Sequence, residues 1–431
     1  MTPGARIQAA VEVLSEMALS RSAGDNVVRR YMRSRRYIGS KDRRDITQRV
    51  WRVERHRARL SWSLNEDAPS ARQLIFADSL INDDLDILDL ENLCNGDTYT
   101  PLPLSAKEKA SVNLTKGRLF NQCPPNVASE CPVWLWPYFQ DLFGEETQVE
   151  ISALSEESRV DVRINTMKAS RDEAKALLKE EGLSTHETAF SPIGLSFASR
   201  VSLQSTKAFS SGMIEVQDEA SQIAAMLVDP KPNHFVLDFC AGSGGKSLAI
   251  AAAMAGKGQV VATDTDAERL AKSKVRIRRS GIKTIKTRVL DSENTNWQKR
   301  QRKSFDRVLV DAPCSGTGTW RRRPDEKWRF SEKDLDSYIN AQDSILGEAS
   351  RFVRPLGRLI YVTCSLLKQE NEDRVNNFLS NHEHFHSLSV GDIWKSVFST
   401  RFPGRGRYLR LSPRRHKTDG FFVAIIQRRS E

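Results

Sequence analysis

The chain has 431 residues, of which 39% are hydrophobic and 28% are charged, and its formal net charge is +11. This length suits two or three globular domains. No apolar run is long enough to span a membrane, and the first residues lack the apolar core of a signal peptide. We therefore expect a cytoplasmic protein with no membrane partner.

The first part of the chain predicts helices and is strongly basic. Apolar residues recur at helical spacing over 5–19, 46–60 and 74–81. Residues 29–59 contain 13 Lys and Arg against three acids, whereas residues 83–91 contain five acids. A basic face can contact phosphates, although a solvated helix face explains the pattern equally well. We expect a helical domain over 1–95 and a loop-rich, proline-containing linker over 96–131.

The rest of the chain predicts two α/β regions. Residues 159–167 alternate like a strand, 170–181 suit a helix, and further strands are expected over 187–204, which together predict a small α/β module over 132–210. From 211 to 431, strands and helices alternate as a parallel sheet with crossover helices requires. The overall fold class is therefore α/β.

A glycine-rich turn follows the first strand of the larger region. It consists of Cys240, Ala241, Gly242, Ser243, Gly244, Gly245 and Lys246. A phosphate-binding loop would need glycine in place of Cys240, and a dinucleotide fingerprint would need glycine in place of Ser247. A methyltransferase cofactor loop tolerates this variation, and a loop without a ligand is the alternative.

Two acids follow the next two predicted strands. Asp264 ends the second strand and can accept hydrogen bonds from ribose hydroxyls, and Asp291 ends the third strand, where it can take an adenine amino group. A glycine loop followed by these two acids favours S-adenosyl-L-methionine as the cofactor.

Two cysteines follow the fourth and fifth predicted strands. Cys314 comes shortly after Asp311, and Cys364 ends the fifth strand. Carboxyl ends of parallel strands face the ligand crevice, so both thiols should lie beside the cofactor. A thiolate that adds to carbon 6 of cytosine makes carbon 5 nucleophilic, and an acid near N3, such as Asp311, would help this addition. Spacing alone does not decide which cysteine attacks.

The cysteines show no C-x-x-C pair and no zinc-site spacing, so we expect no metal. Cys94, Cys123 and Cys131 suit burial as small hydrophobic residues.

Several motifs together resemble one known family. The segments CAGSGGK, VLVDAPCSGTG, RRRPDEKW and IYVTCS resemble the RNA (cytosine-5)-methyltransferases of the bacterial Sun/RsmB type, and the resemblance covers about residues 130–428. It implies a Rossmann-like catalytic domain over 211–431, preceded by an RNA-recognition-like module. The segment RRYIGSKDRRDITQRVW resembles a NusB-like RNA-binding domain.

The same resemblance implies roles for individual residues. Cys364 would be the nucleophile and Cys314 the helper in product release. The cofactor would lie on Cys240–Lys246, Asp264, Asp291 and Asp311. Our candidate catalytic residues are Cys364, Cys314, Asp311 and Lys246.

We expect a monomeric enzyme that methylates carbon 5 of a cytosine in RNA, with 16S ribosomal RNA as the first choice, through a covalent cysteine adduct. The alternatives are a transfer-RNA cytosine-5 methyltransferase and a non-catalytic RNA-binding or ribosome-assembly factor. We also expect Trp320 and Trp328 to stack on bases and Arg321–Arg323 to hold phosphates. Packing of both indoles on a core is the alternative to that expectation.

Overall fold

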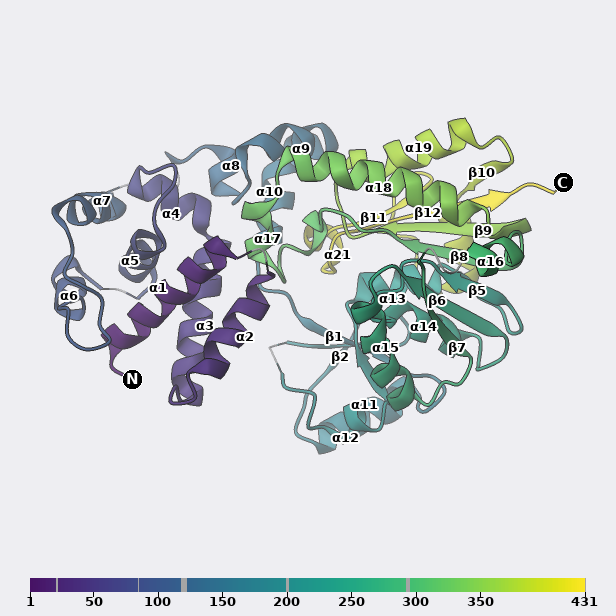
Figure 1. Cartoon of the computed structure of the whole chain (residues 1–431), viewed down its shortest axis with the longest axis horizontal. Coiled ribbons are helices and arrows are strands. Elements are labelled where there is room, and N and C mark those ends of the chain that lie inside the picture. Colours follow the sequence, from purple (N-terminus) through teal and green to yellow (C-terminus); the bar gives the residue numbers. More distant parts are fainter. Residues whose placement is uncertain (21, 84, 118–121, 199–200, 292–294, 431) are drawn as a thin grey trace. The chain divides into compact units, whose positions relative to one another are not determined.

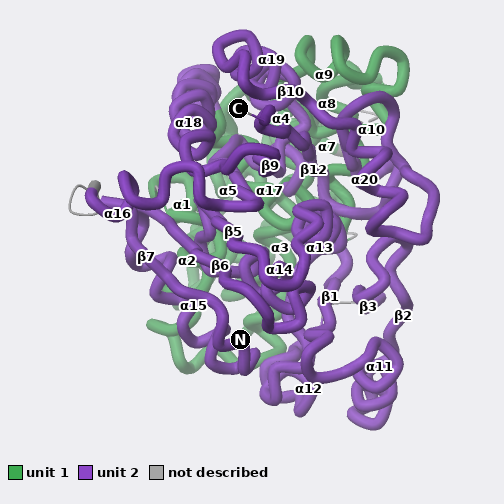
Figure 2. Tube along the Cα trace, turned by 90° about the vertical axis from the view of Figure 1, so that its right-hand side faces the viewer, with its two compact units in different colours: residues 1–157, 320–330 green, residues 158–319, 331–431 purple. Residues whose placement is uncertain are grey.

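The structure is a computed structural model that describes residues 1–20, 22–83, 85–117, 122–198, 201–291 and 295–430. The chain forms two compact units, which are described separately (Figure 2). Unit 1 comprises residues 1–157 and 320–330, and unit 2 comprises residues 158–319 and 331–431.

Unit 1 is helical and contains a large hydrophobic core. Apolar side chains at three- and four-residue spacing, such as Val13, Ile46, Val50 and Phe76, are buried together because each helix turns one apolar face inward. Its helices are α1 (Pro3–Leu19), α2 (Gly24–Ser34), α3 (Ser40–Arg55), α4 (Arg57–Leu64), α5 (Ala71–Asn82), α6 (Ile87–Leu93), α7 (Ala106–Gly117), α8 (Pro125–Ala128), α9 (Trp136–Phe143), α10 (Thr147–Ser152) and α17 (Pro324–Arg329).

The range 96–131, which we expected to be a loop-rich linker, contains helix α7. The prolines that suggested a loop flank this helix instead of interrupting it, and its Val112 is buried in the core of unit 1. The division between the units falls after residue 157, so α9 and α10 pack with the helices of unit 1.

Residues 320–330 join unit 1 although they lie far along the chain. The Trp320 side chain is fully buried and meets the Phe139 ring edge-on at 6.0 Å between centroids. The Trp328 indole donates to the carbonyl oxygen of Glu54 at 2.7 Å, and Arg321 is buried. The prediction that Trp320 stacks on RNA bases is wrong, because its indole ring is fully buried in unit 1. Arg323 is exposed but pairs with Glu326 at 3.0 Å.

Unit 2 contains a small antiparallel sheet of order β2-β3-β1-β4. Val162 and Leu195 pair across β1 and β3 and pack with Leu178 of the neighbouring helix. The strands are β1 (Val160–Ile164), β2 (His186–Glu187), β3 (Gly194–Phe197) and β4 (Ile214–Val216), and the helices are α11 (Arg171–Glu180) and α12 (Lys207–Ser210).

The larger sheet of unit 2 has the order β10-β12-β9-β8-β5-β6-β7, with β11 also paired to β12. Strands β5 to β9 run parallel to one another, and β12 runs antiparallel to β9, β10 and β11. The strands are β5 (Phe235–Asp238), β6 (Gln259–Asp264), β7 (Ile285–Val289), β8 (Phe305–Asp311), β9 (Val353–Thr363), β10 (Phe385–Leu388), β11 (Leu409–Leu411) and β12 (Phe421–Arg428).

Helices cover both faces of this sheet, with α18 and α19 over one face and α13, α14 and α15 over the other (Figure 1). Side chains that alternate along each strand enter opposite cores, as Val236 and Leu237 do. The helices are α13 (Glu219–Met226), α14 (Gly245–Ala253), α15 (Ala267–Ser280), α16 (Thr295–Arg300), α18 (Glu332–Ser350), α19 (Glu372–Asn381), α20 (Val390–Val397) and α21 (Pro413–His416). The predicted α/β fold class with a Rossmann-like sheet is confirmed.

Strand order determines where a ligand can bind. The chain leaves β5 towards β6 and β7 on one side, and then crosses to β8 and β9 on the other side. Such a switch opens a crevice at the carboxyl ends of the central strands. Among the described residues, no helix is long and apolar enough to cross a membrane.

Candidate active site

The glycine-rich turn begins directly after β5 and leads into α14. Gly242 and Gly244 have φ of +53° and +78°, in the left-handed region that favours glycine. The amide of Gly242 donates to Asp264 Oδ2 at 2.7 Å, and the amide of Gly244 donates to the carbonyl oxygen of Ala241 at 2.9 Å. The predicted glycine loop and the acid that ends β6 therefore form one unit.

The acids at the ends of β6 and β7 lie at the same edge of the sheet. Asp264 is buried, and its Oδ1 accepts from the amide of Asp266 at 2.9 Å. The amide of Leu290 donates to the carbonyl oxygen of Asp264 at 2.9 Å, which brings the two strand ends together. Asp291 follows Leu290 and is exposed.

Asp238 ends β5 and was missed by the sequence analysis. It is 1% exposed, its Oδ2 accepts from the hydroxyl of Ser247 at 2.5 Å, and its Oδ1 has no partner among the described residues. Burial, with the nearby charges of Asp311 and Asp264, raises its pKa to about 7. A buried, unpaired acceptor beside the glycine loop fits a ligand that carries an ammonium group. An acid inside an otherwise apolar strand was the available sequence signal.

The two predicted cysteines meet at the ends of adjacent strands. β8 and β9 are parallel, and the amide of Ala312 extends their pairing by donating to the carbonyl oxygen of Val362 at 2.9 Å. The Sγ atoms of Cys314 and Cys364 are 3.4 Å apart, and both residues are half-buried. The hydrogen bond with Cys364 and burial, aided by the charges of Cys364 and Glu370, raise the pKa of Cys314 well above its usual value.

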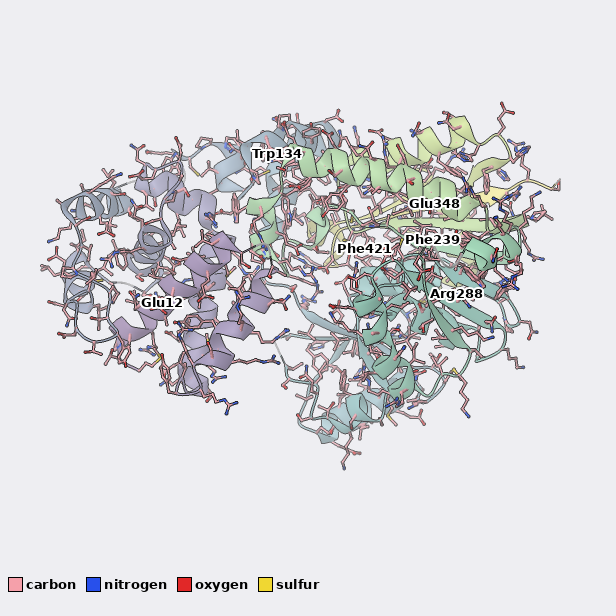
Figure 3. All side chains as sticks on the ribbon, viewed as in Figure 1. Glu12, Trp134, Phe239, Arg288, Glu348 and Phe421 are labelled. Carbon is pink, nitrogen blue, oxygen red and sulfur yellow. The ribbon has the colours of Figure 1, made fainter. Side chains whose placement is uncertain are left out.

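Lys246 and Asp311 form an ion pair beside the cysteines. The Lys246 Nζ lies 2.6 Å from Asp311 Oδ2, and the lysine side chain is 10% exposed. Burial opposes the charge on Lys246, but Asp311, Asp238 and the negative form of Cys364 outweigh this effect and raise its pKa. Nζ also lies 5.3 Å from the ring centre of Phe421, which begins β12 and is labelled in Figure 3.

Two glycines hold the loop that follows β8 and contains Cys314 against neighbouring segments. The amide of Gly318 donates to the carbonyl oxygen of Cys364 at 2.9 Å, and the amide of Gly420 donates to the carbonyl oxygen of Gly318 at 2.8 Å. A Cβ on Gly318 would lie 2.2 Å from the carbonyl oxygen of Gly420. Neither glycine carries a sequence signal for this role, because the close approach depends on three segments far apart in the chain.

Residues 225–427 match the family model described as 16S rRNA methyltransferase RsmB/F. Residues 131–204 match the model described as the RsmF/B-like ferredoxin-like domain. The chain belongs to the RsmB/F methyltransferase family. The resemblance inferred from its motifs is thereby confirmed, and membership supports S-adenosyl-L-methionine as the cofactor.

Curated relatives agree with this family. The chain is 32% identical over 300 residues to the "Probable ribosomal RNA small subunit methyltransferase B" of Synechocystis sp., and the aligned part covers 69% of the chain and 66% of the relative. It is 31% identical over 300 residues to the protein of the same name in Bacillus subtilis, with the same two coverages. The chain thus spans about two thirds of the length of these relatives.

Solved structures share the fold of this RsmB/F-family chain. The crystal structure of PH0851 is similar along 99% of both chains, with a TM-score of 0.80 and 25% identity. The structure of NSun6 from Pyrococcus horikoshii with SFG matches 70% of this chain and 100% of its own, with a TM-score of 0.62 and 22% identity. The second similarity shows the fold alone.

Proposed function

We propose that this RsmB/F-family protein methylates carbon 5 of a cytosine in RNA through a covalent cysteine adduct, with 16S ribosomal RNA as its substrate. One observation carries the proposal: two thiols 3.4 Å apart lie at the carboxyl edge of the sheet, in the same strand-end region as the Lys246–Asp311 ion pair. The names of the curated relatives support ribosomal RNA as the substrate. Such a substrate would place the protein in the cytoplasm, where we propose that it acts as a monomer.

The cofactor, when bound, supplies an electrophilic methyl group. In this proposal the backbone of Cys240–Lys246 holds it, with Asp264 at the ribose and Asp291 at the adenine. The unpaired Oδ1 of Asp238 would accept from its ammonium group. Asp311 ends β8, which lies between β5 at this pocket and β9 at Cys364 in the sheet order, and it would face both.

The nucleophile in the proposal is Cys364. Its thiolate adds to carbon 6, the carbon–sulfur bond forms, and the displaced electron pair moves onto N3, which takes a proton from water. The Asp311 carboxylate would accept a hydrogen bond from the resulting N3–H. The ammonium group of Lys246 stabilises the thiolate before this addition.

Product release reverses the addition after carbon 5 has received the methyl group. Water removes the proton from carbon 5, the carbon–sulfur bond breaks, and its electron pair returns to the Cys364 sulfur while N3 gives up its proton. The Cys314 thiol donates a hydrogen bond to the departing sulfur across the 3.4 Å contact.

Exposed cations in both units support an RNA substrate. Part of the basic stretch of unit 1 is neutralised within the fold, because Arg52 pairs with Asp78 and Asp83. Other cations of this stretch remain exposed, and they are Arg29, Arg33, Arg36, Lys41 and Arg44.

Unit 2 exposes a basic edge that the sequence analysis missed. Lys283 precedes the edge strand β7, and Lys286 and Arg288 alternate along it, with Arg288 labelled in Figure 3. Lys283 and Lys286 form no ion pair with any described residue. Uncompensated cations on an edge strand suit phosphate contacts.

Methyl transfer to small-subunit RNA that lacks the modification tests the proposal. Tritiated methyl groups should enter one cytosine, and Cys364→Ala should abolish transfer while cofactor binding persists. Cys314→Ala should accumulate RNA covalently held by Cys364, seen as a shifted band on a denaturing gel, and Cys123→Ala in unit 1 is the matched control. Label in transfer RNA instead would favour the transfer-RNA enzyme. No label in any RNA, despite cofactor binding, would favour an assembly factor.

A further inference from the structure

Glu370 is a fully buried carboxylate between β9 and α19, with 0% of its surface exposed. It accepts hydrogen bonds from the Ser315 amide at 2.8 Å, from the hydroxyl groups of Ser315 and Ser365, and from Gln342 Nε2 at 3.0 Å. No lysine or arginine among the described residues forms an ion pair with it. A buried carboxylate is costly, and these neutral donors offset that cost.

The donors to Glu370 come from both cysteine loops. Ser315 directly follows Cys314, and Ser365 directly follows Cys364. The two serine hydroxyls also lie 3.2 Å apart. A single carboxylate therefore joins the segments that carry the two thiols.

Asn371, the residue after Glu370, contacts both neighbours of Cys364, and we call the contacts of Glu370 and Asn371 with the two cysteine loops the bracket. Asn371 donates to the carbonyl oxygen of Ser365 at 2.9 Å and accepts from the hydroxyl of Thr363 at 2.6 Å. Residues on both sides of Cys364 are thus held. The hydroxyl of Tyr361 donates to the carbonyl oxygen of Glu370 at 2.6 Å, which anchors the bracket to β9.

We propose that Glu370 is a positioning residue that holds the Cys314 and Cys364 loops in register and places a negative charge beside the Cys314 thiol. The catalytic meaning of this inference rests on the proposed function, whereas the hydrogen bonds of Glu370 are independent of it. A neutral Cys314 can donate a hydrogen bond to the Cys364 sulfur, whereas two adjacent thiolates would repel each other.

The charge of Glu370 acts in the required direction. The hydrogen bond with Cys364 and burial are the larger causes of the raised pKa of Cys314, and the negative charge of Glu370 adds to them. A hydrogen bond from the backbone of Gly316 opposes these effects and lowers the pKa of Cys314. Gln342 donates to the carbonyl oxygen of the preceding Pro313 at 2.9 Å. Lys246 is paired with Asp311 at 2.6 Å.

Glu370→Gln separates charge from shape, because glutamine keeps the volume and one acceptor oxygen. Glu370→Ala removes both the charge and the volume. The matched control is Glu383→Gln, at an exposed glutamate that follows α19. We expect Glu370→Gln to lower kcat at least about tenfold with KM for RNA unchanged, because hydrogen bonds to a buried charge are lost. The covalent adduct between Cys364 and RNA should accumulate, because release of the methylated RNA depends on Cys314. Unchanged kcat in both Glu370 variants would overturn the positioning role.

Two measurements test the effect of the bracket on the two thiols without RNA. In a Cys364→Ala background, the pH midpoint for alkylation of Cys314 by iodoacetamide should fall with Glu370→Gln, because a negative charge that disfavours the thiolate is removed. In the otherwise unaltered chain, cross-linking of the two thiols by dibromobimane should slow in Glu370→Ala. An unchanged pH midpoint would overturn the electrostatic part, and unchanged cross-linking would overturn the geometric part.

These outcomes are distinguishable from failure of the proposed function. If the protein methylated no RNA, the alkylation and cross-linking results would still report on Glu370. If Glu370→Ala failed to fold, the isosteric Glu370→Gln, checked by circular dichroism, would carry the test.

Discussion

The carboxyl group of Asp238 should make unit 2 less stable as pH rises through neutrality. Its pKa is raised from 3.8 to about 7, mainly because the group is buried. A carboxyl with a raised folded-state pKa contributes stability below its unfolded pKa and loses that contribution as pH rises through the folded pKa. The full shift corresponds to about 4 kcal/mol, and the part lost between pH 5 and pH 8 is about 2.5 kcal/mol.

Asp238→Asn isolates this contribution, because asparagine has nearly the same shape and no charge to bury. The free energy of unfolding of both proteins would be measured by urea denaturation at pH 5 and pH 8 without cofactor. Other titrating groups cancel in the difference between the two proteins. We expect the variant to gain about 2.5 kcal/mol relative to the parent on going from pH 5 to pH 8.

Ser247→Ala is a useful companion variant, because it removes the hydrogen bond to Asp238 Oδ2 without changing the charge. It should retain the pH dependence of the parent or strengthen it. A stability difference between Asp238→Asn and the parent that is the same at both pH values would refute the reasoning. The carboxyl would then be ionised throughout this range or solvated in the folded protein.

Two further predictions concern the backbone of the site and its RNA contacts. Gly318→Ala should lower the free energy of unfolding by about 1–3 kcal/mol and reduce methyl transfer strongly, because the new Cβ would collide with the Gly420 backbone. Gly347→Ala in α18, where nothing lies within 4 Å, should instead leave activity unchanged and add up to about 1 kcal/mol, and equal effects of the two substitutions would contradict the argument. Lys283→Glu with Lys286→Glu should weaken RNA binding and leave kcat unchanged. The slope of the logarithm of the RNA-binding constant against log salt concentration should become shallower by about 1.5. Exposed Lys257→Glu with Lys333→Glu is the charge-matched control, and an equal loss there would show a general charge effect.

Much of the α/β fold was predictable because it follows from local pattern. Apolar strands alternating with amphipathic helices require a parallel sheet with crossover helices, and β5 to β9 occur where that pattern placed them. Helix α7 was missed because proline composition on either side outweighed its own weak periodicity. The burial of Trp320 was missed because an aromatic ring beside arginines suits a core and an RNA surface equally well.

The sequence by itself determined that Cys314 and Cys364 follow neighbouring strands, beside a glycine loop and the acids Asp264 and Asp311. Chain order suffices for this, because the carboxyl ends of parallel strands converge on one edge. Only the tertiary structure decided that the thiols are 3.4 Å apart. It also showed that Glu370 joins their loops and that Gly318 meets Gly420. Such contacts join segments separated by dozens of residues, and the packing that brings them together leaves no periodic pattern along the chain.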